Sequence, residues 1–367
     1  MDPLQVVFQF LKEEGYETAF NSLVEESGKE YNPRLLREHF LRQNLGEFMI
    51  NKQTAAFRGI LEGKKLRMSS NSNNLSLDAS PVCMIKYGQG FIASFNDQSI
   101  KYFSRNLDII NSVKFSCPTS LSFQIHNDLL FFGGMGGIIG KISLVDFTLQ
   151  ATLQLKVQSV ISIRILGDFL IAVSQSGTLA RIRLSDFEFE STYDHQMPIT
   201  SLCLVSNGVI YSCQNDNVFH YRSNENFNDL KYLYMNPNEL DFGGVGIRDL
   251  RECPCDSCVF AALTDKHRAV IYRFSPERKE LEILANITHF LSDGLTQPQI
   301  IWPHGRYVFV TSDEMKIVGV DISSNSVLCK KDGWKKSPRC MIWLENRLII
   351  GAFDKSLSYI DFEDEND

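Results

Sequence analysis

A unit of short β-strands recurs about every 40 residues over most of this 367-residue chain. Each unit has two apolar runs, a polar turn and a third run, and the third runs begin near Ile100, Ile138, Leu179, Val218, Val270, Ile317 and Leu357. Successive starts differ by 38, 41, 39, 52, 47 and 40 residues. Since one such unit cannot bury its own apolar face, a strand-built repeat of this length predicts a β-propeller.

Seven is the predicted number of blades. The two longer spacings hide insertions at 235–244 and 288–299, so six and eight blades remain alternatives. The seventh unit ends at Asp361, and the residues after it are too few and too acidic for an outer strand. We expect residues 75–79, which precede the first unit, to supply that strand and so remove an exposed sheet edge.

Several of the third runs end in an aliphatic residue close to an aspartate. These endings are Leu144-Val145-Asp146, Leu184-Ser185-Asp186, Val320-Asp321 and Ile360-Asp361. Asp194-His195 stands four residues before the strand at Ile199, where a WD repeat carries Gly-His. The array resembles a degenerate WD-repeat propeller without the Trp-Asp dipeptide. That family's hydrogen-bond network is therefore expected to be largely missing.

The first residues of the chain have a different periodicity. Leu4, Val7, Phe8 and Leu11 fall at helical spacing, Gly15 interrupts the run, and a second amphipathic run follows. The apolar residues of the second run are Tyr16, Ala19, Phe20 and Leu23. Two helices this short cannot cover their own aromatic residues, so these eight side chains are predicted to pair with a second copy.

The stretch from Val7 to Phe20, with its Gly-Tyr pair and the following Ala-Phe, resembles the LisH motif. The resemblance implies a dimerisation module made of paired helices. The expected fold is therefore mostly β: a seven-bladed WD40-like propeller preceded by a small helical segment. The expected divisions are a LisH-like motif at 1–30, a helical extension at 31–68, a linker at 69–76 and the propeller at 77–367.

Composition narrows the class of protein. The net charge of −7 argues against a general nucleic-acid binder, and no apolar run is long enough to form a membrane helix. Nine cysteines without a signal peptide are typical of reduced thiols, so a cytoplasmic or nuclear location is expected. We expect protein partners, including a second copy of the chain. Nucleic acid would be contacted only indirectly if at all.

Three motifs are interpreted as structural features and not as ligand-binding or catalytic sites. The run Gly133–Lys141 fits neither a dinucleotide-binding nor a P-loop pattern and is interpreted as turn glycines. Cys253, Cys255 and Cys258 lack a second Cys-x-x-Cys, so we interpret them as a surface loop and leave zinc as an alternative. Aspartates recur at the turns, at Asp97, Asp216, Asp265, Asp313 and Asp354. No catalytic residue, cofactor site or metal site is predicted.

A basic segment between the sixth and seventh units is the candidate partner-binding site within the propeller. Its residues are Lys330, Lys331, an exposed-looking Trp334, Lys335, Lys336 and Arg339. It could bind an acidic partner or a nucleic-acid backbone, serve as a nuclear signal, or be only a solvated loop.

These features predict a non-enzymatic, homodimeric scaffold that presents propellers to protein partners. Proteins with this layout act in splicing, transcriptional corepression and dynein or microtubule regulation, and the residues here do not distinguish among these roles. Two alternatives remain: a substrate-receptor or scaffold subunit of a ubiquitin ligase, and an enzyme that uses the propeller channel.

Overall fold

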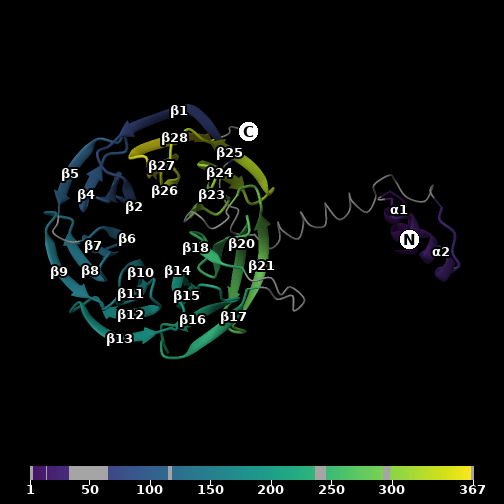
Figure 1. Cartoon of the computed structure of the whole chain (residues 1–367), viewed down its shortest axis with the longest axis horizontal. Helices are drawn as coiled ribbons and strands as arrows, with labels where there is room; N and C mark the ends of the chain where they lie inside the picture. Colours follow the sequence, from purple (N-terminus) through teal and green to yellow (C-terminus); the bar gives the residue numbers. More distant parts are fainter. Residues whose placement is uncertain are drawn as a thin grey trace. The chain divides into compact units, whose positions relative to one another are not determined.

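The computed structural model describes residues 3–13, 15–32, 65–114, 118–235, 245–291 and 298–364. The chain forms two compact units, Met1–Arg58 and Gly59–Asp367. The described residues of the first unit form two helices, and the second unit is a seven-bladed β-propeller (Figure 1). Most of the expected helical extension at 31–68 falls at positions 33–64, outside the described residues.

The helical unit begins with α1 (Pro3–Glu13), and α2 (Glu17–Ser27) follows it directly. Gly15 lies between them at φ +77°, a conformation that glycine adopts without steric cost. Gly28 ends α2 at φ +60°, and its amide donates to the Val24 carbonyl. The two predicted helices and the turn at Gly15 are confirmed. Neither described helix has the length and apolar character needed to cross a bilayer.

The propeller consists of four-stranded antiparallel sheets, which we number as blades 1 to 7. Blades 1 to 4 contain β2 (Pro81–Tyr87), β3 (Gly90–Phe95), β4 (Ser99–Phe103), β5 (Ile109–Lys114), β6 (Ser120–His126), β7 (Leu129–Gly134), β8 (Ile138–Ser143), β9 (Leu149–Gln154), β10 (Val160–Leu166), β11 (Phe169–Ser174), β12 (Thr178–Arg183), β13 (Glu188–Asp194), β14 (Ile199–Val205), β15 (Gly208–Cys213), β16 (Val218–Ser223) and β17 (Leu230–Tyr234).

Blades 5 to 7 contain β18 (Ile247–Glu252), β19 (Val259–Thr264), β20 (Ala269–Ser275), β21 (Glu280–Ile287), β22 (Ile300–His304), β23 (Tyr307–Ser312), β24 (Lys316–Asp321), β25 (Ser326–Lys331), β26 (Pro338–Leu344), β27 (Arg347–Ala352), β28 (Ser356–Asp364) and the early strand β1 (Leu66–Ser76). In every blade, the third strand begins within one residue of its predicted start. The predicted count of seven blades is confirmed.

Strand β1 closes the ring by pairing antiparallel with β28, and Figure 1 shows it as the outermost strand of blade 7. The register places Leu66 opposite Asp364 and Leu75 opposite Leu357. Closure by an N-terminal strand is confirmed, but the strand ends at Ser76 instead of occupying 75–79. The expected linker at 69–76 is wrong, because backbone pairing with β28 holds these polar residues in a sheet.

The apolar core lies between the faces of neighbouring blades. Between blades 7 and 1, for example, Ile342, Leu344 and Ile349 pack with Phe91 and Phe103. Second strands such as β3 and β27 are buried along their whole length, because both of their faces contact other blades. Each fully buried aromatic or aliphatic side chain contributes about 1.5–3 kcal/mol. Apolar packing between blades is thus the main source of stability.

Candidate protein-interaction surfaces

The helical unit has a small aromatic core of its own. Phe8 is fully buried, and its ring lies 5.8 Å from that of Phe20 and 6.4 Å from that of Tyr31, both in edge-to-face geometry. The Gln5 amide nitrogen donates to the Glu30 carbonyl at 2.8 Å, and its oxygen accepts from the Asn32 amide at 2.8 Å. The chain after α2 is thereby fastened to α1, which the helical periodicity did not predict.

The eight predicted dimer contacts fall into three groups. Phe8 is a core residue of its own unit and offers no surface. Leu4, Leu11, Phe20 and Leu23 are partly exposed. Val7, Tyr16 and Ala19 are exposed, with 41% of Val7 and 55% of Tyr16 accessible to solvent. Of the eight predicted residues, the partly exposed and the exposed ones have side-chain surface that a partner can contact.

One face of the propeller is formed by the turns between second and third strands and by the linkers that lead into the first strands. In every blade the first turn residue donates its amide to a carbonyl of the adjoining linker. The pairs are Asn96 to Ser80, Met135 to Thr119, Gln175 to Ser159, Gln214 to Pro198, Asp265 to Gly246, Asp313 to Leu291 and Phe353 to Ser337. We call this surface the turn–linker face, and its repeated bonds make it a pre-organised platform.

The recurrent turn aspartates support this face. Asp97 and Asp354 each accept from the amide and hydroxyl of the serine two residues later, at 2.5–3.1 Å. Asp216 accepts from the Val218 amide at 3.3 Å, and Asp265 accepts from the Gly246 amide at 2.9 Å. For these four residues the predicted role in turn geometry is confirmed. The glycine run likewise forms the turn between β7 and β8, with Gly136 and Gly137 at positive φ.

The basic segment is divided by the structure. Trp334 is buried instead of exposed: it packs in the core between blades 6 and 7, and its indole nitrogen donates to the Ser358 hydroxyl at 3.2 Å. Arg339 lies on the inner strand β26, with its guanidinium carbon 5.4 Å from the Phe353 ring centre. Lys335 and Lys336 are exposed on the turn–linker face, whereas Lys330 and Lys331 end the outer strand β25.

The cysteine cluster forms the loop between β18 and β19. The Asp256 carboxylate accepts from the Cys258 amide at 2.9 Å, as in an Asx turn. Cys253 is buried and Cys255 is exposed. Burial raises the pKa of the Cys253 thiol to about 11, against the opposing effect of nearby backbone amides, so it is protonated at neutral pH. Within the described residues, no three histidine, cysteine or acidic side chains are grouped to hold a metal ion.

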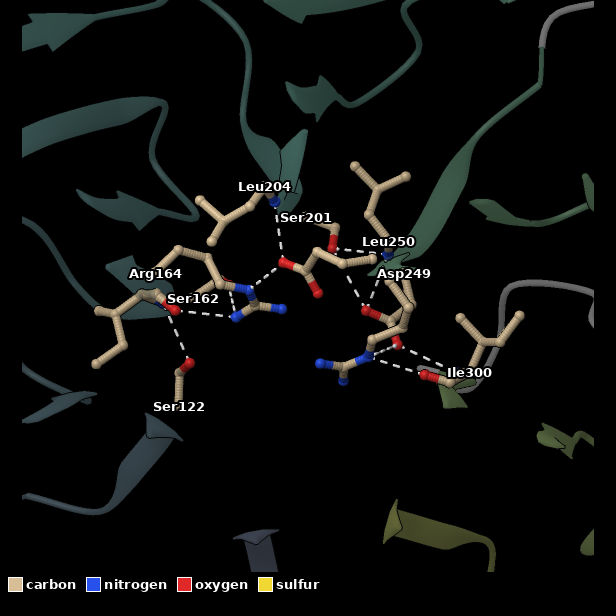
Figure 2. Close-up of polar contacts among 11 residues, drawn as sticks. Ser122, Ser162, Arg164, Ser201, Leu204, Asp249, Leu250 and Ile300 are labelled. Carbon is tan, nitrogen blue, oxygen red and sulfur yellow. Dashed lines mark hydrogen bonds and ion pairs between the residues drawn. The ribbon is translucent and has the colours of Figure 1, made fainter. Parts of the chain in front are cut away.

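A charged network joins the inner strands of blades 3 to 5 (Figure 2). Arg164 on β10 donates from Nε to Glu252 Oε1 on β18 at 2.7 Å. The same carboxylate oxygen accepts from the Leu204 amide on β14 at 2.9 Å. Burial opposes the charge of Glu252, but Arg164 and this amide outweigh that effect and lower its pKa. The carboxylate is therefore kept ionised as a cross-link between blades.

Further polar side chains continue this network around the ring. Asp249 accepts from the Ile300 amide of blade 6 at 3.0 Å, and Ser201 accepts from the Leu250 amide of blade 5 at 2.9 Å. Ser122 of blade 2 accepts in the same way from the Ile163 amide of blade 3, at 3.1 Å. Ser122, Ser201 and Asp249 each come directly after a register shift in the innermost strand of their blade. Each of them accepts a hydrogen bond from a backbone amide of the next blade (Figure 2). The repetition indicates that these residues join blades together.

Blade 4 contains a second polar cluster. The His195 imidazole and the Tyr211 hydroxyl lie 2.8 Å apart, and so do the His220 imidazole and the Asp216 carboxylate. The Tyr211 and His220 rings stack at 5.0 Å. Burial, together with His220 and Arg222, lowers the pKa of His195 to about 4. The position of His195 was noted in the sequence, but Tyr211 and His220 carried no signal of their own.

No known protein-family model matches this sequence. No curated protein is significantly similar to it either.

Proposed function

We propose that this protein is a non-enzymatic scaffold that dimerises through its N-terminal helices and presents propellers to protein partners. The observation that carries the proposal is the pair of short helices whose exposed side includes Val7 and Tyr16. Isolated helices of this length are marginal in water, and a second copy would cover these side chains. The LisH resemblance of residues 7–20 points the same way.

The propeller supports a binding role more than a catalytic one. Propellers commonly serve as interaction platforms, and the turn–linker face of this one is held by a bond in every blade. The charged side chains of Arg164 and Glu252 bind each other. Arg164 also donates to the Ile163 carbonyl of its own strand, and Glu252 accepts from the Leu204 amide of the neighbouring blade. A dimer would present two such platforms, and two linked weak contacts raise avidity by about 10²–10⁴. We place this activity in the cytoplasm or the nucleus.

Light scattering on the full-length protein tests the proposal. We expect a dimer at micromolar concentration for the wild type and a monomer for the double variant Val7→Asp/Tyr16→Asp. The matched control is Val145→Asp, since Val145 is 83% exposed on a turn of the propeller. The control should stay dimeric, and circular dichroism should be unchanged for all three proteins. A monomeric wild type would refute the dimer.

A further inference from the structure

Three large apolar side chains are exposed close together on the turn–linker face of blades 6 and 7. Leu291 lies in the linker into blade 6, Met315 in the β23–β24 turn and Phe353 in the β27–β28 turn. Their exposed fractions are 45%, 42% and 44%. Met135, in the β7–β8 turn, and Met197, in the linker into blade 4, are exposed on the same face but in other blades. Ile109 and Val327 are exposed on outer strands.

Backbone contacts place these residues in one continuous area. The Asp313 amide donates to the Leu291 carbonyl at 3.0 Å, which holds the linker against the turn that contains Met315. The register of β24 with β25 places Ile317 opposite Lys331, so the linker at 332–337 starts beside that turn.

The same linker continues to the next turn. The Phe353 amide donates to the Ser337 carbonyl at 3.2 Å, and the Lys335 amide donates to the Asp354 carboxylate at 2.8 Å. Leu291 and Met315 are thus joined to Phe353 through the linker at 332–337.

Lysines share the turn–linker face with these apolar side chains. Lys335, Lys336 and Lys355 are exposed on the same face. The segment 330–339 carries five cationic residues and one aspartate, in a chain whose net charge is −7. Of the nearby carboxylates, Glu314 pairs with Lys316 at 3.5 Å, and Asp354 accepts hydrogen bonds from Ser356 and Lys335. With Asp313 and Asp332 included, the described residues of this area hold four carboxylates. Five lysines oppose them, namely Lys316, Lys331, Lys335, Lys336 and Lys355, so one positive charge is in excess.

We propose that this area, defined by Leu291, Met315, Phe353, Lys335, Lys336 and Lys355, binds an acidic protein segment that carries bulky apolar side chains. The inference rests on the proposed scaffold function and names the chemistry of its partner. Apolar side chains of the partner would cover the exposed methionine, leucine and phenylalanine, and its carboxylates would meet the lysines of the same face. The binding would therefore weaken as the salt concentration rises.

The test is selection from a phage-displayed library of random dodecapeptides on the full-length wild-type protein. We expect selected peptides to be enriched in Asp and Glu next to Phe, Leu, Ile or Trp. Fluorescein-labelled copies of the best peptides are then measured by anisotropy. The triple variant Lys335→Glu/Lys336→Glu/Lys355→Glu should bind them at least about tenfold more weakly, and so should Met315→Ser/Phe353→Ser.

Matched controls change charge and apolar surface elsewhere. Lys65→Glu/Lys86→Glu/Lys279→Glu alters three exposed lysines near the opposite ends of the strands, and Val145→Ser removes an exposed side chain there. Both should bind within about twofold of the wild type. Absence of selected binders, selection without acidic enrichment, or equal binding by the patch variants would overturn the proposal.

Light scattering on the same samples separates the two proposals. Patch variants that lose peptide binding should remain dimers. A monomeric wild type that still binds the peptides would refute the dimer and leave this site standing. If the patch variants become monomers, the area is a contact between copies, and the peptide site is refuted.

Discussion

Arg164 and Glu252 bond across an intervening blade: Nε of Arg164 on β10 lies 2.7 Å from Oε1 of Glu252 on β18, and the strand between them supplies the Leu204 amide. Only 8% of the Arg164 side chain is exposed, so its charge depends on this partner. A single carboxylate thereby holds three blades in register around the axis.

Replacing Glu252 should therefore destabilise the propeller. Glu252→Gln keeps an acceptor for Leu204 but leaves the Arg164 guanidinium without its counter-charge. We expect the free energy of unfolding to fall by about 2–3 kcal/mol, as measured by urea denaturation. Glu188→Gln, which removes an exposed partner of Arg183, should change it by less than about 0.5 kcal/mol. Equal losses in the two variants would contradict the cross-link.

His195 should make the fold sensitive to mild acid. The pKa of this side chain is about 4 in the folded protein and about 6.5 when unfolded, so the unfolded chain binds the extra proton between these values. The contribution of His195 is complete above pH 6.5 and is lost as the pH falls toward 4. We expect a loss of up to about 2 kcal/mol between pH 7 and 4.

Thermal unfolding across this pH range measures the effect of His195. His195→Gln should flatten the dependence, while His126→Gln, at an exposed histidine, should retain the wild-type profile. If His195→Gln leaves the pH dependence of thermal unfolding unchanged, His195 is not the source of the acid sensitivity.

Strand β1 should be required for a stable ring. A chain that begins at Lys65 retains β1, whereas one that begins at Leu77 exposes the edge of β28 and loses the buried Leu66. We expect the shorter chain to lose at least about 2 kcal/mol and to aggregate through the open edge. Urea denaturation and light scattering would report both effects. Comparable stability of the two chains would show that closure by β1 contributes little.

Gly140 should be intolerant of a side chain. A Cβ at this position would lie 2.2 Å from Cζ of Phe132, within the buried sheet of blade 2. We expect Gly140→Ala to cost about 1–3 kcal/mol in a urea titration. Gly136→Asn is the control, because a Cβ at that turn position would lie 3.4 Å from Cγ of Pro118, an ordinary van der Waals contact, and asparagine tolerates its positive φ. A tolerated Gly140→Ala together with a damaging Gly136→Asn would reverse this interpretation of the glycine run.

The periodicity of the chain was enough to predict the third strands, the seven blades and the two helices around Gly15. These features depend on alternation and turn residues within a few positions of each other. The outer strand β1 was misplaced, because Ser69 to Ser76 have no apolar alternation and the strand is held by backbone bonds to β28. Trp334 was misjudged for a related reason: its basic neighbours suggested exposure, but a core between two blades buries it.

The sequence by itself therefore determined the repeating architecture, because strand and turn preferences act locally. Only the tertiary structure decided which distant residues meet. Arg164 reaches Glu252 because the ring sets the inner strands of successive blades side by side. Leu291, Met315 and Phe353 share one face with the lysines because the turns and linkers of all blades lie at the same ends of the strands. Contacts between residues dozens of positions apart leave no periodic trace in one sequence, since they depend on the register and closure of the whole propeller.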